Sequence, residues 1–352
     1  MEAMGMKFVW SMLVVTRRNK IEETRPRWKA KQIIINNESM LPYDYLILFG
    51  GETFQNVDTS YTGDTMLTPR ERKPVATAES PHNVFYINCE SDAFHALLAV
   101  KSIMRRQRIY NIIVYGHNIE SYCCINVLLE FGVKGPAITY IDPITQSGFI
   151  DPYCQDKKVN DAIVAYLCEK EVVIYSDYCF VGWTMNPNQS NVCSAKFQTR
   201  TKYIDIQCDA LFFYGNKDVS LQTFSALNNA SLVYNGRLVI NTRFQTNDAY
   251  IFAGGSLTKY AGRLYADKFN HCYYNAVEVG SKMAQEMLKI WDPTVEPTGR
   301  GETLNNILPH TFTKPLVINC QLPGKINFLH VLKPGVIVPI QAIIQQESYV
   351  SQ

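Results

Sequence analysis

The residues best placed to do chemistry in this chain form a single glycine turn at Gly116. The segment Gly116-His-Asn-Ile-Glu-Ser121 follows an apolar run and precedes a helical pattern, the context in which a dinucleotide-binding turn occurs. Such a turn needs three glycines, because the backbone must approach the pyrophosphate and the helix N-terminus must donate to it. Here only the first glycine is present, Asn118 puts a side chain in the path of the phosphates, and Glu120 adds negative charge. Asp142, 26 positions after Gly116, could stand as a ribose-binding acid, so we predict a nucleotide-site topology with a damaged pocket.

Other constellations of reactive side chains do not indicate catalysis. The six histidines show no metal-ligand spacing, and the chain has neither a G-x-S-x-G elbow nor a phosphate-binding P-loop. Gly299-Arg-Gly301 begins a glycine fingerprint but lies in a proline-rich stretch and follows no strand. The vicinal pair Cys123-Cys124 is predicted to lie on a helix, where neighbouring side chains point about 100° apart, so we interpret both as helix-core thiols. We expect no metal and no bound cofactor.

The remaining cysteines and basic residues have ordinary explanations. The ten cysteines contain no CxxC pair and no regular framework, so free thiols are expected. Arg105, Arg106 and Arg108 end a predicted helix, where positive charge complements the helix dipole, and we interpret them as a solvated face.

Composition excludes several classes of function. Apolar residues make up 47% of the chain and charged residues 19%, an ordinary globular balance. A formal charge of +2 gives no reason to expect nucleic acid or an anionic membrane as the main partner. No apolar run reaches the roughly 20 residues that span a bilayer, and no signal peptide is recognisable, so an intracellular protein is expected.

The hydrophobic pattern predicts an α/β architecture from residue 85 onward. Alternating apolar runs and amphipathic stretches predict strand–helix units, and the order of the units implies a doubly wound parallel sheet with an inserted meander of two strands. The expected helices are 91–107, 119–131, 160–170 and 275–291. The expected strands are 8–16, 28–36, 43–49, 111–115, 137–141, 172–176, 193–199, 201–207, 210–214 and 251–255, with a hairpin at 232–240 around Asn235-Gly236.

The order of these segments resembles the pyridine nucleotide–disulphide oxidoreductases. Pro42–Gly51, which ends in Gly50 and Gly51, resembles the strand that closes the first part of their flavin domain. Ile112–Asp142 resembles their nicotinamide-binding unit, and the segment from Ile251 to Ser256, which contains Gly255, resembles their flavin-binding segment. This resemblance implies a degenerate Rossmann-like FAD/NAD(P)-binding fold with a small C-terminal α+β domain. The implied parts are a flavin-like remnant (1–82), a nicotinamide-nucleotide-like domain (83–215), a flavin-like return segment (216–291), a linker (292–303) and a dimerisation-like domain (304–352).

A narrower resemblance lies in the second half of the chain. Leu232–Asp248, Leu257-Thr-Lys-Tyr260 and Met287–Pro297 resemble the C-terminal half of the cilia- and flagella-associated protein 61 family. That family implies a place in the calmodulin- and spoke-associated complex at the base of an axonemal radial spoke, with protein partners from that complex, in the cytoplasmic cytoskeleton of the cilium or flagellum. It also implies that this chain lacks a large preceding region, and that 1–352 alone will be poorly soluble or oligomeric while 85–215 folds independently.

Departures from active oxidoreductases decide the functional interpretation. The glycine turn for the FAD pyrophosphate has no counterpart, Ser256 replaces the aspartate of the flavin segment, and no redox cysteine pair is present. We therefore expect a non-catalytic structural module needed for cilium movement and organisation. Residues 304–352 offer a surface for dimerisation, and whether the assembly is a dimer or a heteromer is left open. The alternatives are an FAD- or NAD(P)-dependent oxidoreductase and a nucleotide-sensing module without turnover. Under each of these interpretations, the positions that correspond to the cofactor-binding site are Gly50, Gly51, Gly116, Asn118, Ser121, Asp142, Gly255 and Ser256.

Overall fold

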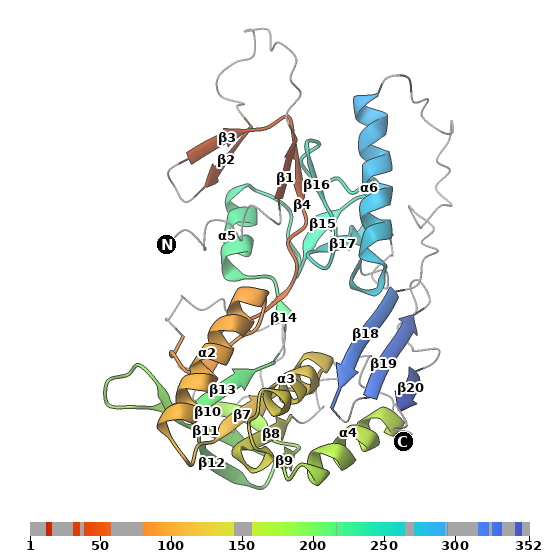
Figure 1. Cartoon of the computed structure of the whole chain (residues 1–352). Helices are drawn as coiled ribbons and strands as arrows, with labels where there is room; N and C mark the ends of the chain where they lie inside the picture. Colours follow the sequence, from red (N-terminus) through yellow and green to blue (C-terminus); the bar gives the residue numbers. More distant parts are fainter. Residues whose placement is uncertain are drawn as a thin grey trace. The chain divides into compact units, whose positions relative to one another are not determined.

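The computed structural model divides into two compact units, which are taken separately (Figure 1). Unit 1 comprises Met1–Glu52, Val219–Leu316 and Leu332–Ile337, and unit 2 comprises Thr53–Asp218, Val317–Val331 and Val338–Gln352. The chain therefore passes between the units at 52–53 and returns at 218–219, whereas the sequence-based boundaries are 82–83 and 215–216. The structure describes residues 12–15, 31–35, 39–57, 80–143, 157–215, 217–264, 271–292, 294, 316–323, 326–332 and 342–346. The linker and dimerisation-like domain lie mostly outside these residues and stay predictions.

Unit 2 is built on a five-stranded sheet in the order β6-β13-β7-β8-β9. All four pairings are parallel, and the strands are short apolar runs, as expected for a sheet buried on both faces. The strands are β6 (Val84–Phe85), β7 (Ile112–Tyr115), β8 (Ile138–Asp142), β9 (Val173–Ser176) and β13 (Ala210–Phe213). This parallel sheet with its crossover helices confirms the predicted Rossmann-like α/β class.

The two faces of this sheet are covered by different structures. Successive strand residues point to opposite faces, and here Ile112 and Val114 pack with helix residues while Ile113 and Tyr115 pack with residues of an antiparallel sheet. The helices are α2 (Glu90–Arg106), α3 (Ile119–Glu130) and α4 (Lys157–Glu169). The antiparallel sheet is the predicted meander, with a third strand that the sequence did not reveal: β10 (Cys179–Met185), β11 (Val192–Gln198) and β12 (Tyr203–Gln207). The meander therefore covers the face that helices cover in an ordinary doubly wound sheet.

Unit 1 centres on a three-stranded sheet in the order β1-β4-β16. β4 (Tyr45–Leu48) pairs in parallel with β16 (Ile251–Ala253) and antiparallel with β1 (Met12–Val15). Helix α6 (Ala276–Trp291) buries Val279, Met283 and Met287 in the same core. A short helix, α5 (Leu221–Asn229), begins at the cap Ser220, whose side chain accepts from the amide of Thr223 at 3.2 Å. Sequence analysis missed α5 but predicted β4, β16 and α6.

The predicted hairpin at Asn235-Gly236 is only partly formed. Gly236 adopts the positive φ of +72° that the turn needs, and Tyr234 and Leu238 form one antiparallel bridge. The strand that follows, β15 (Leu238–Ile240), pairs in parallel with β17 (Thr258–Tyr260). The two arms of the turn are hydrogen-bonded, since the Val239 amide donates to the Val233 carbonyl at 2.9 Å, and the second arm also pairs with β17 on its other edge.

Short elements complete the described parts. Two pairs are antiparallel: β2 (Gln32–Ile35) with β3 (Ser39–Pro42), and β5 (Thr53–Phe54) with β14 (Lys217–Asp218). A separate three-stranded sheet contains β18 (Leu316–Leu322), β19 (Ile326–Leu332) and β20 (Ala342–Gln346). The 3-10 turns are Gly135–Ala137, Gly262–Leu264 and His271–Tyr273. Among the described helices, none combines the length and the apolar character needed to cross a membrane.

Candidate functional site

Gly116 ends β7 at the carboxyl edge of the parallel sheet, where the chain order reverses between β7 and β13. Ligands of open α/β sheets bind at this kind of switch point. The glycine has a φ of +141°, and a Cβ added to it would lie 2.3 Å from the carbonyl oxygen of Tyr214. Its own carbonyl accepts a hydrogen bond from the Tyr140 hydroxyl at 3.0 Å. Close contact with the end of β13 therefore requires glycine here whether or not a nucleotide binds.

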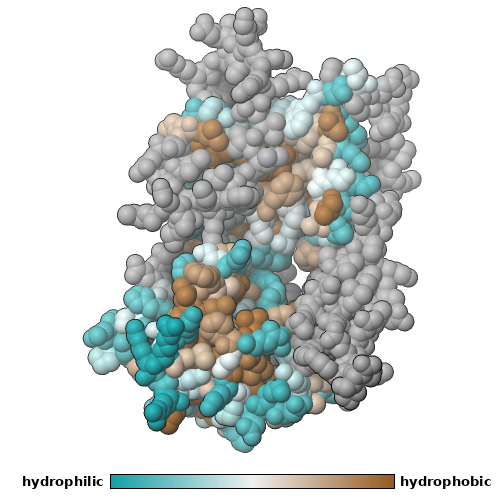
Figure 2. Space-filling view, in the orientation of Figure 1, coloured by the Kyte–Doolittle hydropathy of each residue, from teal (hydrophilic) through white to brown (hydrophobic). Residues whose placement is uncertain are grey.

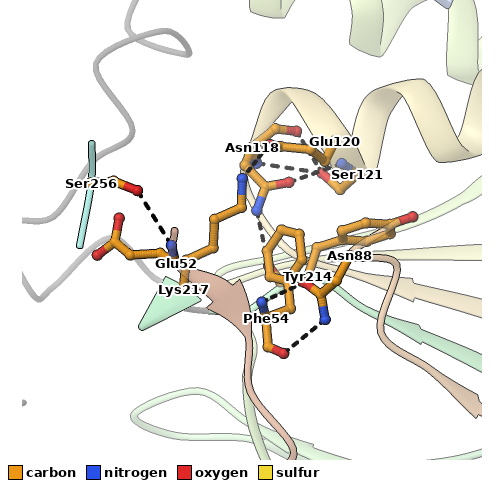
Figure 3. A network of polar contacts seen from close by, with 9 residues as sticks. All are labelled: Glu52, Phe54, Asn88, Asn118, Glu120, Ser121, Tyr214, Lys217 and Ser256. Atoms are coloured by element: carbon orange, nitrogen blue, oxygen red, sulfur yellow. Dashed lines mark hydrogen bonds and ion pairs between the residues drawn. The ribbon is translucent and has the colours of Figure 1, made fainter. Parts of the chain in front are cut away.

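Asn118 occupies the N-terminus of α3 with its own side chain (Figure 3). Its side-chain Oδ1 accepts from the backbone N–H of Ser121 at 2.8 Å. The backbone N–H of Asn118 in turn donates to the Ser121 hydroxyl at 3.4 Å, so the two residues form a reciprocal cap. The Asn118 amide nitrogen Nδ2 also donates to the Tyr214 carbonyl at 3.0 Å, which ties α3 to the end of β13. One of the donors that an anion would use is therefore engaged, and an amide side chain lies at the switch point.

Glu120 lies in the first turn of α3 and forms an ion pair with Lys217 of β14. The Lys217 Nζ also lies 4.8 Å from the centroid of the Phe54 ring, and Phe54 packs edge-on against Tyr214. The pair is solvent-exposed, at 41% for Glu120 and 39% for Lys217, so it contributes little to stability. It does offset the negative charge that the sequence alone assigned to this helix end. The obstruction at Gly116 is accordingly more steric than electrostatic.

Asp142 ends β8 at the same edge of the sheet, as predicted for a ribose-binding acid. Its carboxylate Oδ1 lies 2.9 Å from Nδ1 of His117, and the two side chains are 22% and 15% exposed. A histidine from the glycine turn thus contacts the acid that a ribose would need, a pairing that the predicted strands did not suggest.

The vicinal cysteines lie on α3 as free thiols packed against the unit 2 core. Burial raises the pKa of Cys124 to about 12, partly offset by a hydrogen bond with Tyr214. Burial also raises the pKa of the Tyr214 hydroxyl, and the neighbouring Cys124 adds to the rise. A thiol with a raised pKa is a poor nucleophile at neutral pH, so Cys124 lacks the thiolate that disulphide chemistry needs.

The flavin-like segment of unit 1 brings the other predicted site residues together. Gly255 follows β16 with a φ of +78°, and a Cβ on it would meet no atom within 4 Å. A Cβ on Gly51 would lie 3.5 Å from the Ser256 hydroxyl, and one on Gly50 would lie 3.4 Å from Leu257. The structure therefore joins Gly50 and Gly51, after β4, to Gly255 and Ser256, after β16, through the parallel pairing of the two strands.

A charged pair that the sequence did not reveal lies beside Ser256. Arg237 donates to the Ser256 carbonyl and to the Glu52 carboxylate, while the Glu52 amide donates to the Ser256 hydroxyl at 3.3 Å. Arg237 and Glu52 are largely buried, at 24% and 18% exposed. They are 185 positions apart, so no local pattern could have paired them. The hydroxyl and the carbonyl of Ser256 therefore both accept hydrogen bonds from protein groups.

His271 is buried, at 4% exposed, and is hydrogen-bonded to the segment that contains Gly255 and Ser256. Its Nδ1 accepts from the Gly255 amide at 3.2 Å, and its Nε2 lies 2.9 Å from the Tyr260 hydroxyl. An accepting Nδ1 places the proton on Nε2, so the ring is neutral and donates to Tyr260. Burial raises the pKa of Tyr260 and keeps its hydroxyl protonated. Among the described residues, no group of three or more histidine, cysteine or acidic side chains could hold a metal ion.

Comparisons with known proteins bear on the fold and on part of the sequence. No family model matches the chain. Over 148 residues, 38% of this chain, it is 30% identical to cilia- and flagella-associated protein 61 of Tetrahymena thermophila. The match spans only 8% of that protein's length.

Solved structures of FAD- and NAD-dependent reductases are similar to most of the chain. The putidaredoxin reductase–putidaredoxin complex matches 86% of this chain and 60% of its own, with a TM-score of 0.53 and 16% identity. An FAD-dependent pyridine nucleotide-disulphide oxidoreductase from Desulfovibrio vulgaris matches 86% and 65%, with a TM-score of 0.52 and 14% identity. An NAD-dependent persulfide reductase from A. fulgidus matches 85% and 46%, with a TM-score of 0.53 and 13% identity. The chain thus has the FAD/NAD(P)-binding fold of the pyridine nucleotide–disulphide oxidoreductases, and part of its sequence is similar to cilia- and flagella-associated protein 61.

Proposed function

We propose that this chain is a non-catalytic structural module of the motile cilium. The similarity to cilia- and flagella-associated protein 61 supports a cilium- or flagellum-associated role. The finer proposal is assembly into the calmodulin- and spoke-associated complex at the base of an axonemal radial spoke, with proteins of that complex as partners. In this proposal the oxidoreductase fold is kept as a scaffold and its cofactor chemistry is absent.

The observation that carries the loss of chemistry is the position of Asn118. Its side chain caps α3 and reaches the Tyr214 carbonyl at 3.0 Å, across the switch point of the parallel sheet. A pyrophosphate at this helix end would have to break both hydrogen bonds before it could bind. The NAD(P) position is therefore filled by groups that also stabilise the fold.

Unit 1 supports the same proposal independently. The Ser256 hydroxyl replaces a carboxylate that could accept from cofactor hydroxyls, and it already accepts from the Glu52 amide. Arg237 and His271 hold the surrounding backbone on either side. FAD would meet a segment in which the Ser256 hydroxyl and carbonyl and the Gly255 amide are already paired within the protein.

An absorption spectrum of the purified chain, produced with any native N-terminal extension, tests the proposal directly. We expect no flavin bands and no FAD released on heating, and no NADH or NADPH binding by calorimetry below millimolar concentrations. A stoichiometric yellow preparation would establish the oxidoreductase alternative instead. Micromolar nucleotide binding without flavin would establish a nucleotide-sensing module.

A pair of substitutions locates the obstruction. Asn118→Gly with Glu120→Ala removes both side chains from the start of α3, and we expect weak NADH binding to appear. Asn275→Gly is the matched control, because Asn275 caps α6 in unit 1 through the amides of Val277 and Glu278. If the double variant and the control are equally inactive in binding, Asn118 is not what closes the site.

A further inference from the structure

Helix α2 presents an exposed stripe that the fold does not use. Phe94 and Leu98 are 60% and 49% exposed, although the helix also has a buried face. The buried face is formed by Ala96 and Val100, at 1% and 0% exposed, which pack into the unit 2 core. Phe94 and Leu98 are four positions apart and lie on the opposite side of the helix.

The same stripe continues as positive charge toward the end of α2. Lys101 and Arg105 are exposed and follow Phe94 by seven and eleven positions, so they lie on the same helix face. Arg106 and Arg108 add two more exposed cations beside them. Within the described part of the chain, no ion pair is recorded for these four side chains. From Phe94 to Arg105 the stripe is about 16 Å long at the rise of an α-helix.

Figure 2 shows apolar side chains in brown and strongly hydrophilic ones in teal lying close together over the region of α2 and α3. The polarity of the α2 stripe changes along the helix axis, from apolar in its first half to cationic in its second. An interacting surface must therefore offer apolar groups at one end and negative charge at the other.

We propose that this face of α2 binds an acidic amphipathic helix of a partner protein. Apolar side chains of the partner pack on Phe94 and Leu98, and its carboxylates pair with Lys101 and Arg105, which lie on the same helix face. Three turns of helix match the length of the stripe, and two helices can pack closely along such a ridge. The carboxylates are required because a neutral surface would remove water from these cations without pairing them, and a basic surface would repel them.

An anionic membrane fits the stripe less well than a helix does. Interfacial helices bury an apolar face along their length and carry cations along both sides of it. On α2 the cations follow the apolar residues along the axis, and the opposite face is fixed in the unit 2 core, so the helix cannot turn to insert. The proposal goes beyond the closed cofactor positions and does not depend on them, since bound nucleotide at Gly116 would leave this face unchanged.

The probe is a synthetic helical peptide of about 20 residues with a leucine face and flanking glutamates. Its binding to the full chain is measured by fluorescence anisotropy, beside a matched peptide with lysine in place of every glutamate. We expect the acidic peptide to bind in the micromolar range, with affinity falling as salt is raised, and the basic peptide to bind at least about tenfold more weakly. Equal affinity for the two peptides, or no binding of the acidic peptide below millimolar concentrations, overturns the proposal.

Three variants of the full chain, each checked for unchanged unfolding, assign binding to the stripe. Phe94→Ser with Leu98→Ser, and separately Arg105→Glu with Arg106→Glu, should each weaken the acidic peptide by about tenfold or more. The charge-reversed variant should instead gain affinity for the basic peptide. Lys134→Glu with Lys202→Glu, at exposed positions off α2, is the control and should change little.

Vesicles of phosphatidylserine and phosphatidylcholine separate a membrane from a helix. We expect no sedimentation of the chain with them at physiological salt. Sedimentation that Arg105→Glu with Arg106→Glu abolishes would assign the face to a membrane and overturn the proposal. Failure of the stripe variants to affect peptide binding would do the same, without bearing on whether cofactors bind.

Discussion

The glycine turn at Gly116 in unit 2 and the glycine segment at Gly255 in unit 1 keep the same kind of backbone for different reasons. At Gly116 the neighbouring strand leaves no room, since a Cβ would lie 2.3 Å from the Tyr214 carbonyl oxygen. At Gly255 there is room, with nothing within 4 Å of a Cβ, and only the φ of +78° favours glycine. Each glycine is therefore explained by the fold alone.

The side chains beside the two glycine segments also differ. Unit 2 uses one neutral amide, Asn118, and an exposed ion pair between Glu120 and Lys217. Unit 1 uses a largely buried ion pair between Glu52 and Arg237 and a buried histidine. Removing one partner of a buried ion pair leaves the other charge unpaired, whereas removing a neutral amide leaves only uncharged donors and acceptors unpaired.

Alanine at the two glycines gives the largest contrast. We expect Gly116→Ala to destabilise unit 2 by about 4 kcal/mol, from backbone strain and overlap with a backbone oxygen that cannot move aside. Gly255→Ala should destabilise unit 1 by only about 1.5 kcal/mol, the cost of a positive φ. Hydrogen exchange at β7 and at β16 reports each unit separately. Equal losses would mean that the close contact at Gly116 relaxes and that the two glycines are retained for one reason.

The two ion pairs give the second contrast. Arg237→Met leaves the Glu52 carboxylate largely buried and unpaired, and we expect a loss of about 2–3 kcal/mol in the free energy of unfolding. Adding Glu52→Gln should restore most of that loss. Lys217→Met, which breaks the exposed pair of unit 2, should cost under about 0.5 kcal/mol. Chemical denaturation of the wild type and these three variants measures the losses. A larger loss from Lys217→Met than from Arg237→Met would mean that the ion pair of unit 2, and not that of unit 1, is the more stabilising.

Elements with a strong local pattern could be predicted from the sequence. Helices α2, α3 and α6 and strands β7, β8, β13 and β16 each combine an apolar period with a glycine or polar boundary. Strand β10 was missed because its register against β11 shifts twice, near Gly182 and Met185, which breaks the alternation that marks a strand. Helix α5 was missed because it is short and polar, although Ser220 was a visible cap.

The contacts of the candidate site also fall into those that the sequence could predict and those that it could not. Gly116, Asn118, Ser121 and Asp142 are close in sequence or follow adjacent parallel strands, so their proximity follows from topology. The Asn118-x-x-Ser121 spacing was also a visible sign of a reciprocal cap. By contrast, Lys217 meets Glu120 across 97 positions and Arg237 meets Glu52 across 185. Such pairs depend on how distant segments are packed, and no local signal specifies them.

The caps of α3 and α6 give a third, smaller contrast between the units. Asn118→Ala removes a helix cap and the hydrogen bond to Tyr214, so we expect a loss of about 2 kcal/mol. Asn275→Ala removes only a cap and should cost about 1 kcal/mol. Asn118→Ser keeps the cap but cannot reach Tyr214, and it should fall between the wild type and Asn118→Ala. If Asn118→Ala costs no more than Asn275→Ala, the bond across the switch point contributes nothing.

The smallest contrast is in how the two units respond to alkaline pH. In unit 2, burial raises the pKa of Cys124 from 9.0 to about 12, so the folded protein keeps a proton that the unfolded chain loses above pH 9. This contribution to stability is complete below pH 9 and declines as pH rises toward 12. Between pH 9 and 10 it should cost unit 2 about 1 kcal/mol.

In unit 1 the corresponding decline starts later. Burial raises the pKa of Tyr274 from 10.0 to about 12, so its contribution is complete below pH 10 and is lost as pH rises toward 12. Between pH 9 and 10 this tyrosine should cost unit 1 only about 0.4 kcal/mol, so Cys124 makes unit 2 weaken more steeply over this range. Hydrogen exchange at β7 and β16 over this range measures both units in one sample. Cys124→Ala should remove about 1 kcal/mol of the decline at β7 between pH 9 and 10 and leave β16 unchanged. An unaltered pH dependence at β7 would mean that the Cys124 thiol is not enclosed against Tyr214, and that α3 is packed less tightly at the switch point than the Asn118 contacts imply.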